Sequence, residues 1–209
     1  QLIRPLSQWI IEQACAQLNK LSGSGVQIAV NLSMMDLHED DLPERIASTI
    51  EQFGVSSEKL MIEITEGQIM REPEQVIKIL QRLSAMGIAL SIDDFGTGYS
   101  SLSALQQFPI GTLKIDQSFV RDADVDPDDA TIVSTIIEMG RSLRMDVVAE
   151  GVETEKQLNL LRRKRCHYVQ GHLLGPPTSA EGYLDMLKAE TQGTGRYRQL
   201  FVENKAAGL

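Results

Sequence analysis

The chain has 209 residues, of which 42% are hydrophobic and 23% charged, so it suits one sizeable globular domain. Its formal net charge of −9 argues against binding a nucleic-acid polymer, because phosphate backbones are bound through Lys and Arg. No apolar stretch approaches the ~20 residues that span a bilayer and no signal peptide is recognisable, so we expect no membrane contact by this domain. Cys15 and Cys166 form no CxxC pair, which favours a reducing compartment.

Apolar residues at helical spacing predict an opening helix over residues 3–21. Further helices are expected around residues 42–53, 73–83, 132–143 and 158–161. Thr154 with Gln157 resembles a capping box, and Thr178 with Glu181 repeats that signal before a last helix. We expect residues 1–190 to form the domain and residues 191–209 to be a linker or tail. Trp9 and Cys166 are expected to pack in the core or between helices.

Short apolar runs between these helices predict six strands. They cover residues 26–31, 60–66, 88–94, 112–116, 145–150 and 166–170. Regular alternation of strand and helix predicts the α/β class, and near-continuously apolar strands indicate a parallel sheet covered by helices. We therefore predict a TIM-type (β/α) barrel. A doubly wound sheet is the alternative, but the Gly-rich turn after its first strand is missing. A closed barrel needs eight strands, so we expect two N-terminal strand units to lie outside this sequence.

Polar residues stand at or beside the end of each predicted strand. These residues are Asn31, Glu63, Asp93, Asp94, Lys114, Asp116, Glu150 and Gln170. Such residues do not stabilise a buried strand, since an unpaired charge out of water costs several kcal/mol unless the group changes its protonation and becomes neutral. Their recurrence at the same end of successive strands predicts one shared site.

The oxygen donors of this set indicate a site for hard cations. Carboxylates and an amide without a histidine cluster favour Mg²⁺, Mn²⁺ or Ca²⁺. The adjacent Asp93 and Asp94 suit two metals, which activate a water and stabilise in-line displacement at phosphorus. Lys114 could hold that water or neutralise the developing charge. The pattern therefore predicts phosphodiester hydrolysis.

A small polar loop with two glycines follows Asp94 and runs to Leu102. Such a loop can approach a ligand closely. Glu66, just beyond the strand of Glu63, is predicted to hold the loop through its backbone N–H groups.

Six linked motifs resemble those of EAL domains, bacterial cyclic-di-GMP phosphodiesterases, between about residues 2 and 188. They are Asn31–Ser33, Glu63–Glu66, Ile92–Leu102, Leu113–Asp116, Ala149–Glu153 and Gln170–Gly171. The resemblance implies a modified TIM barrel that opens cyclic-di-GMP to linear pGpG with two Mg²⁺ or Mn²⁺ ions per site, with Ca²⁺ inhibitory. It also implies a cytoplasmic location, either alone or as the cytoplasmic domain of a larger, membrane-tethered sensor protein.

The resemblance further assigns roles to residues of this chain. Asn31, Glu63 and Asp93 would bind the first metal, and Asp93, Asp94 and Glu150 the second. Catalytic roles would fall to Lys114 and Gln170, which orient the water, to Glu150, and to Glu66, which steadies the loop after Asp94. Substrate-binding or supporting roles would fall to Asp116, Glu153, Thr97 and Gly98. That loop and the adjacent helix would form a homodimer contact.

The chain also departs from the family pattern. The Glu-Ala-Leu motif and a substrate-binding arginine are expected before residue 1. His172 stands where the family usually has an aromatic residue, and Gly175-Pro-Pro177 replaces the usual basic or polar residue before a proline. Both departures affect the expected guanine pocket. We otherwise interpret His167 and His172 as structural residues whose polar atoms are satisfied.

Other functions stay open at this point. A catalytically silent EAL domain would act as a cyclic-di-GMP receptor or protein-interaction module. A Mg²⁺-dependent lyase with Lys114 as its base fits the residues without the family. The acidic stretch 122–129 lacks the Gly and Glu of an EF-hand and is interpreted as a solvated turn before a helix. Asp94-Phe-Gly96 lacks the other kinase motifs.

Overall fold

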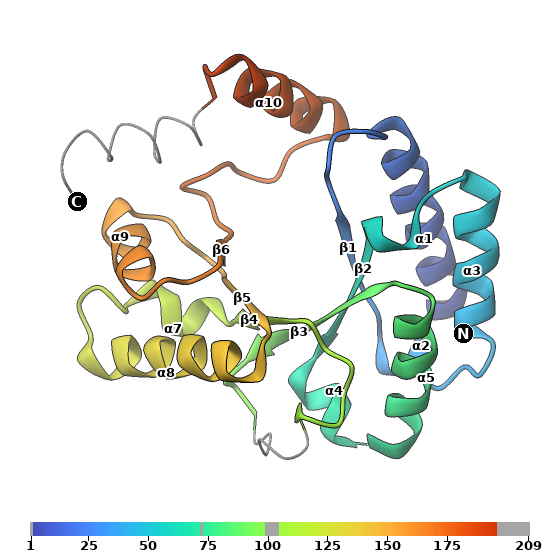
Figure 1. The fold of residues 1–209 in the computed structure, drawn as a ribbon, viewed down its shortest axis with the longest axis horizontal. Helices are drawn as coiled ribbons and strands as arrows, with labels where there is room; N and C mark the ends of the chain where they lie inside the picture. The colour runs from blue at the N-terminus through green and yellow to red at the C-terminus, as the bar shows by residue number, and fades with distance from the viewer. Residues whose placement is uncertain (1, 72, 99–104, 196–209) are drawn as a thin grey trace.

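The computed structural model describes residues 2–71, 73–98 and 105–195. Its described strands form one parallel sheet in which each strand pairs with the next along the chain. The strands are β1 (Ile28–Asn31), β2 (Leu60–Thr65), β3 (Ala89–Phe95), β4 (Thr112–Ile115), β5 (Asp146–Ala149) and β6 (Tyr168–Val169). The sheet curls into a half-barrel with β1 and β6 at its two ends (Figure 1). The predicted α/β barrel class is therefore confirmed, with six of its strands described.

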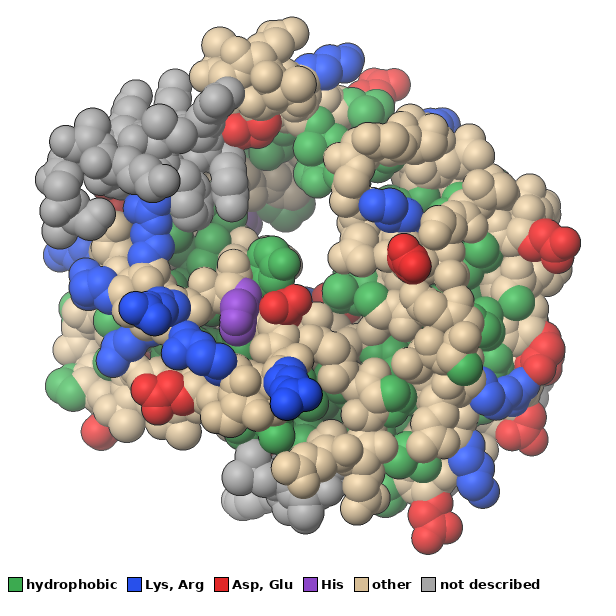
Figure 2. Space-filling model, viewed as in Figure 1, with side chains coloured by type: hydrophobic (Ala, Val, Ile, Leu, Met, Phe, Trp, Pro, Cys, Tyr) green, Lys and Arg blue, Asp and Glu red, His purple; other side chains and the backbone are tan. Residues whose placement is uncertain are grey.

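Helices surround the curled sheet and give the molecule the outline of a ring (Figure 1). They are α1 (Ile3–Lys20), α2 (Met34–Leu37), α3 (Leu42–Phe53), α4 (Glu66–Arg71), α5 (Pro73–Ala85), α7 (Gln117–Arg121), α8 (Pro127–Leu143), α9 (Glu155–Arg163) and α10 (Ala180–Gln192), with the short 3₁₀ turn η1 (Ser57–Lys59). Within the described chain, no helix is both long and apolar enough to cross a membrane. Figure 2 shows an opening at the centre of the ring, below α10.

The core lies between the sheet and the helices. Ile62, Ile64, Leu90, Ile92 and Leu113 are buried strand residues, and the longer helices α1, α3, α5, α8 and α9 each bury apolar residues in the same core, whereas α10 buries none. Fully burying an aliphatic side chain of this size contributes about 1.5–3 kcal/mol. This packing fixes the strand ends relative to one another, which positions the polar residues that follow.

One of the two predicted helix caps is confirmed. Thr154 forms the predicted capping box of α9 with Gln157, and Asp126 caps α8 at the end of the acidic stretch, as expected of a solvated turn. The cap predicted at Thr178 is wrong. The helix α10 is capped by Ser179, whose hydroxyl oxygen accepts a hydrogen bond from the backbone N–H of Gly182. The extended backbone of Ser179 places its hydroxyl over that N–H, one residue later than expected.

The prediction that Trp9 packs in the core or between helices is also wrong, because the residue is 56% exposed. The helix α1 is apolar on several sides but packs through one stripe, at Ser7, Ile11, Ala14, Cys15 and Leu18. Trp9 lies off that stripe, since residues two positions apart do not share a helix face. Cys166 is partly buried and packs against the core, as predicted. The division of the chain at residue 190 stays a prediction, and residues 196–209 of the expected tail lie outside the described residues.

Candidate active site at the carboxyl ends of the strands

All six described strands point in the same direction, so their carboxyl ends meet at one edge of the half-barrel. The sheet register pairs Asn31 with Glu63 and places Asp93 one strand further, opposite Thr65. Lys114 on β4 and Glu150 just after β5 complete the row. The structure therefore brings together the residues that the sequence placed at successive strand ends.

Lys114 is the centre of this cluster. Its Nζ lies 3.0 Å from Oε1 of Glu63, 3.0 Å from Oδ1 of Asp93 and 2.7 Å from Oε1 of Glu150. The side chain is only 7% exposed, so water screens these contacts weakly. The amide Nδ2 of Asn31 lies 3.4 Å from the other carboxylate oxygen of Glu63. One buried cation thus holds carboxylates from three strands together.

Burial and charge shift the pKa values in this cluster. Burial raises the pKa of Glu63 and of Glu150 above the ordinary carboxyl value, although Lys114 opposes the change. Burial alone would lower the pKa of Lys114, but hydrogen bonds to Glu150 and Asp93 and the attraction of Glu63 outweigh it and raise that pKa. Lys114 is therefore charged at neutral pH and acts as a hydrogen-bond donor to these carboxylates.

The end of β3 turns two consecutive carboxylates toward the site. The register between β3 and β4 shifts between Ile92 and Phe95, and Asp94 adopts a left-handed backbone with φ of 53°. Left-handed geometry is uncommon outside glycine and marks a backbone held by its surroundings. Carboxylate oxygens of Asp93, Asp94 and Glu150 lie within 4.8 Å of one another. Burial and the charge of Asp93 raise the pKa of Asp94.

The net charge of this cluster favours cations. Glu63, Asp93, Asp94 and Glu150 carry four negative charges when ionised, and Lys114 supplies one positive charge, which leaves three negative charges in a small, mostly buried space. Oxygen ligands of this kind prefer Mg²⁺, Mn²⁺ or Ca²⁺. The donor set therefore fits divalent cations.

Glu66, the first residue of α4, holds the loop that follows Asp94. Its buried Oε2 accepts hydrogen bonds from the backbone N–H groups of Gly96, at 3.0 Å, and Gly98, at 3.2 Å. A Cβ at Gly98 would lie 2.8 Å from the carboxylate, so a larger residue there would displace the Glu66 side chain. The hydroxyl of Thr97 donates to the carbonyl of Asp94, at 2.8 Å. The predicted contact between Glu66 and this loop is confirmed, while residues 99–104 lie outside the described chain.

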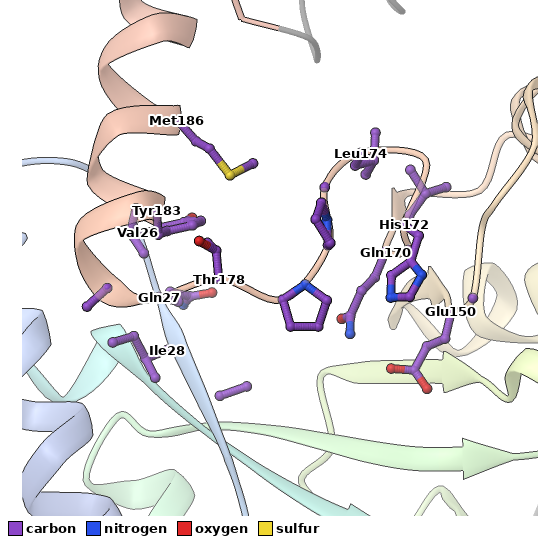
Figure 3. Close-up of a pocket in the computed structure, with 18 of the residues that line it drawn as sticks. Val26, Gln27, Ile28, Glu150, Gln170, His172, Leu174, Thr178, Tyr183 and Met186 are labelled. Atoms are coloured by element: carbon purple, nitrogen blue, oxygen red, sulfur yellow. The ribbon is translucent and has the colours of Figure 1, made fainter.

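The remaining predicted residues line a cavity of about 1020 Å³ beside the acidic cluster. Asp94, Asp116, Glu150, Glu153 and Gln170 contribute to its wall, and Figure 3 shows Gln170 and Glu150 facing the same space. Asp116 also caps α7 by accepting a hydrogen bond from the N–H of Ser118, at 2.9 Å. Burial alone would raise the pKa of Asp116, but its hydrogen bonds from Ser118 outweigh burial and lower it.

The two histidines near β6 have different environments. Nδ1 of His167 accepts a hydrogen bond from the N–H of Val147, at 3.0 Å, so its interpretation as a structural residue is confirmed. The same interpretation is wrong for His172, which is exposed and lines the cavity next to Gln170. The sequence could have indicated this, because His172 follows Gln170 by two residues and the residues just beyond a strand end line the site of such a barrel.

Comparison with known proteins agrees with this geometry. The family model of the EAL domain matches residues 1–177. The chain belongs to the EAL domain family. It is 42% identical over 186 residues to the bifunctional diguanylate cyclase/cyclic di-GMP phosphodiesterase MucR of Pseudomonas aeruginosa, covering 88% of this chain and 27% of MucR. It is 39% identical to the cyclic di-GMP phosphodiesterase NbdA of the same species, covering 90% of this chain and 24% of NbdA. The chain thus spans about a quarter of the length of these larger relatives.

Solved EAL structures share the fold. A complex of the MucR phosphodiesterase with c-di-GMP superimposes with a TM-score of 0.84 at 41% identity, covering 87% of this chain and 75% of that one. A manganese and cyclic-di-GMP complex of BlrP1 from Klebsiella pneumoniae gives 0.77 at 30% identity, covering 83% of this chain and 44% of that one. Another BlrP1 complex contains calcium and cyclic-di-GMP. These relatives confirm the resemblance that the motifs indicated.

Proposed function

We propose that this EAL domain hydrolyses cyclic-di-GMP to linear pGpG. The observation that carries the proposal is the buried Lys114, held by three carboxylates at the strand ends of a fold whose relatives include named cyclic di-GMP phosphodiesterases. A merely structural ion pair would need one carboxylate for one ammonium. The excess of acidic groups around Lys114 instead suits a site that binds cations and a phosphodiester.

Two divalent cations, Mg²⁺ or Mn²⁺, would be held by the oxygen donors of this edge. Asn31, Glu63 and Asp93 are proposed for the first, and Asp93, Asp94 and Glu150 for the second. When bound, these ions would supply an activated water and neutralise charge on the phosphate. Ca²⁺ is larger and less demanding of geometry, and we propose that it occupies the site without supporting turnover.

The chain's own groups would position the reactants. The Lys114 ammonium is a rigid donor at the carboxylate edge, where it can orient the attacking water and stabilise charge that develops on phosphorus. We propose that the Gln170 amide provides a second hydrogen bond to that water from the cavity wall. Asp116 and Glu153, on the same wall, would contact or support the bound nucleotide.

Glu66 is proposed to link this chemistry to assembly. Through Gly96 and Gly98 it fixes the segment that carries Asp94 and Thr97, so the position of a metal ligand depends on this loop. A homodimer contact through the loop and the adjacent helix would therefore affect the site directly. We further propose a cytoplasmic location for the domain, within a larger signalling protein.

The proposal is tested by incubating the complete protein that carries this chain with cyclic-di-GMP and separating the products chromatographically. Mg²⁺, Mn²⁺ and Ca²⁺ are compared, together with Asp93→Asn, Lys114→Ala and Lys188→Ala. Lys188 is an exposed lysine of α10 and serves as the control. We expect pGpG with Mg²⁺ or Mn²⁺, little with Ca²⁺, and loss of activity only in the Asp93 and Lys114 variants. Tight binding without turnover would instead make the domain a receptor.

A further inference from the structure

Basic residues gather at the ends of α8 and α9, just before the strands β5 and β6 begin. Figure 2 shows Lys and Arg side chains over these two helices. Because β5 and β6 are paired neighbours, the turns that lead into them lie side by side. The basic patch is defined by four exposed residues of these turns and helix ends: Arg144, Arg163, Lys164 and Arg165. The chain as a whole has a formal net charge of −9, so this patch is opposite in sign to the rest of the molecule.

The patch residues are not neutralised by carboxylates of the described chain. Arginines elsewhere in the chain form ion pairs; they are Arg4, Arg45, Arg82 and Arg121. Among the described residues, no side chain of the basic patch forms one. Even Asp146, the exposed first residue of β5, is not paired with them. The patch therefore presents surplus positive charge to a partner.

Arg141 joins the two turns that carry the patch. Its Nη2 donates hydrogen bonds to the carbonyl oxygens of Lys164, at 3.2 Å, and Arg165, at 3.3 Å. Arg141 lies in the last turn of α8, so these bonds tie the end of α8 to the turn after α9. The charges of the patch are thus mounted on a fixed surface, which lowers the entropy cost of binding a partner.

The backbone at Arg144 and Arg165 indicates that their side chains matter. Both residues are left-handed, with φ of 60° and 58°. Glycine is the usual residue where a helix ends in this conformation. In this chain α3, α5 and α10 are followed by Gly54, Gly87 and Gly193, all with positive φ. Helix termination therefore does not call for arginine at these two places, and the long cationic side chain is the better explanation.

The composition of the patch favours a protein as its partner. Guanidinium groups bind carboxylates through paired N–H bonds, and Arg and Tyr are enriched at protein interfaces. Tyr168, the first residue of β6, is 58% exposed and follows the patch closely in the chain. A membrane-binding surface would combine its cations with exposed Trp, Phe or Leu, and Tyr168 is the exposed large apolar residue among the described residues 141–169. A long polyanion such as RNA would extend from the patch onto the acidic remainder of the molecule.

We propose that the basic patch binds an acidic segment of a partner protein, whose Asp and Glu carboxylates pair with Arg144, Arg163 and Arg165. The patch lies at the amino-terminal ends of β5 and β6, whereas the acidic cluster lies at the carboxyl ends. Extended chain from Arg144 to Glu150 spans about 20 Å at roughly 3.3 Å per residue. A partner bound at the patch therefore leaves the catalytic edge open. This interaction does not depend on the proposed hydrolysis.

The double substitution Arg144→Gly with Arg165→Gly tests the patch in the complete protein. Glycine adopts the left-handed backbone without strain, so the melting temperature should not fall. We expect the affinity for a fluorescent poly-glutamate peptide, measured by anisotropy, to weaken at least about tenfold. Added salt should weaken wild-type binding in the same assay. Lys78→Ala with Lys188→Ala is the matched control, because it removes two exposed charges from α5 and α10 and should leave the affinity unchanged.

Equal peptide affinity in the two double variants would overturn the proposal, as would a wild type that does not bind the peptide. Tighter, patch-dependent binding to vesicles of anionic phospholipid or to single-stranded RNA than to the peptide would overturn the assignment to a protein partner. Loss of peptide binding in Arg144→Gly with Arg165→Gly, with hydrolysis of cyclic-di-GMP unchanged, supports it. A wild type that binds the peptide through the patch but does not hydrolyse cyclic-di-GMP overturns the proposed function alone.

Discussion

Replacing Lys114 by Met tests the hypothesis that the acidic cluster binds cations. The substitution keeps an unbranched side chain of similar length and removes the ammonium that contacts Glu63, Asp93 and Glu150. Without metal, these carboxylates lose their shared partner. Breaking a buried ion pair by removing one partner costs about 3–5 kcal/mol. Asp93 and Glu150 are 14% and 16% exposed and can reach water, so we expect the lower end, about 3 kcal/mol.

Divalent cations should change this result. A domain of this size loses about 2–4 °C in Tm per kcal/mol, so Lys114→Met should melt about 6–12 °C lower than the wild type in excess chelator. Bound Mg²⁺ or Mn²⁺ compensates the same carboxylates, so the difference should fall to less than half when the ions are added. Calorimetry of the complete protein measures both values for the transition of this domain.

Lys188→Met provides the matched control, since Lys188 makes an exposed contact to Asp185 and should shift Tm by less than about 2 °C with or without metal. A Lys114→Met difference of equal size in chelator and in Mg²⁺ would refute the reasoning. It would mean that the carboxylates are organised for Lys114 itself and take no cation.

Further predictions follow from the same geometry. Burial raises the pKa of Glu63, so this residue stabilises the fold below its ordinary pKa of 4.5, and the stabilisation is lost as the pH rises through the folded-state pKa. Urea unfolding of the metal-free protein at a series of pH values should show this loss, and the Glu63→Gln variant should show a smaller one. Gly98→Ala should reduce activity at least about tenfold, because its Cβ would displace the Glu66 carboxylate that holds the loop after Asp94. Gly67→Ala is the control: its Cβ would meet nothing within 4 Å, so the rate should be unchanged. Ser179→Ala should destabilise α10 by about 1 kcal/mol and Thr178→Ala by much less; equal losses in a thermal melt would contradict the cap assignment.

The order of the strands and longer helices, and the residues that gather at the strand ends, could be predicted from the sequence. Helical and continuous apolar periodicities reflect the burial of each segment, so they identified the six described strands and the longer helices. The short helices α2, α4 and α7 were not predicted, because four to six residues are too few to show a helical period. Carboxylates at strand ends are anomalous for a buried segment, which made Glu63, Asp93 and Glu150 visible as site candidates before any contact was known. The contact between Glu66 and the loop after Asp94 was also predictable, since glycine N–H groups beside a buried carboxylate have few other partners.

Tertiary packing decided what these residues contact. The three carboxylates around Lys114 come from segments far apart in the chain, and only the curl of the sheet sets their distances of 2.7–3.0 Å. Trp9 is exposed because packing selects one stripe of an apolar helix, and His172 faces the cavity because Val152 fixes the turn beneath it. Periodicity reports how much of a segment is buried, whereas the direction of one side chain depends on which neighbours occupy the space around it. The sequence alone thus determined which polar residues stand at the strand ends, and the fold determined which of them lie in contact.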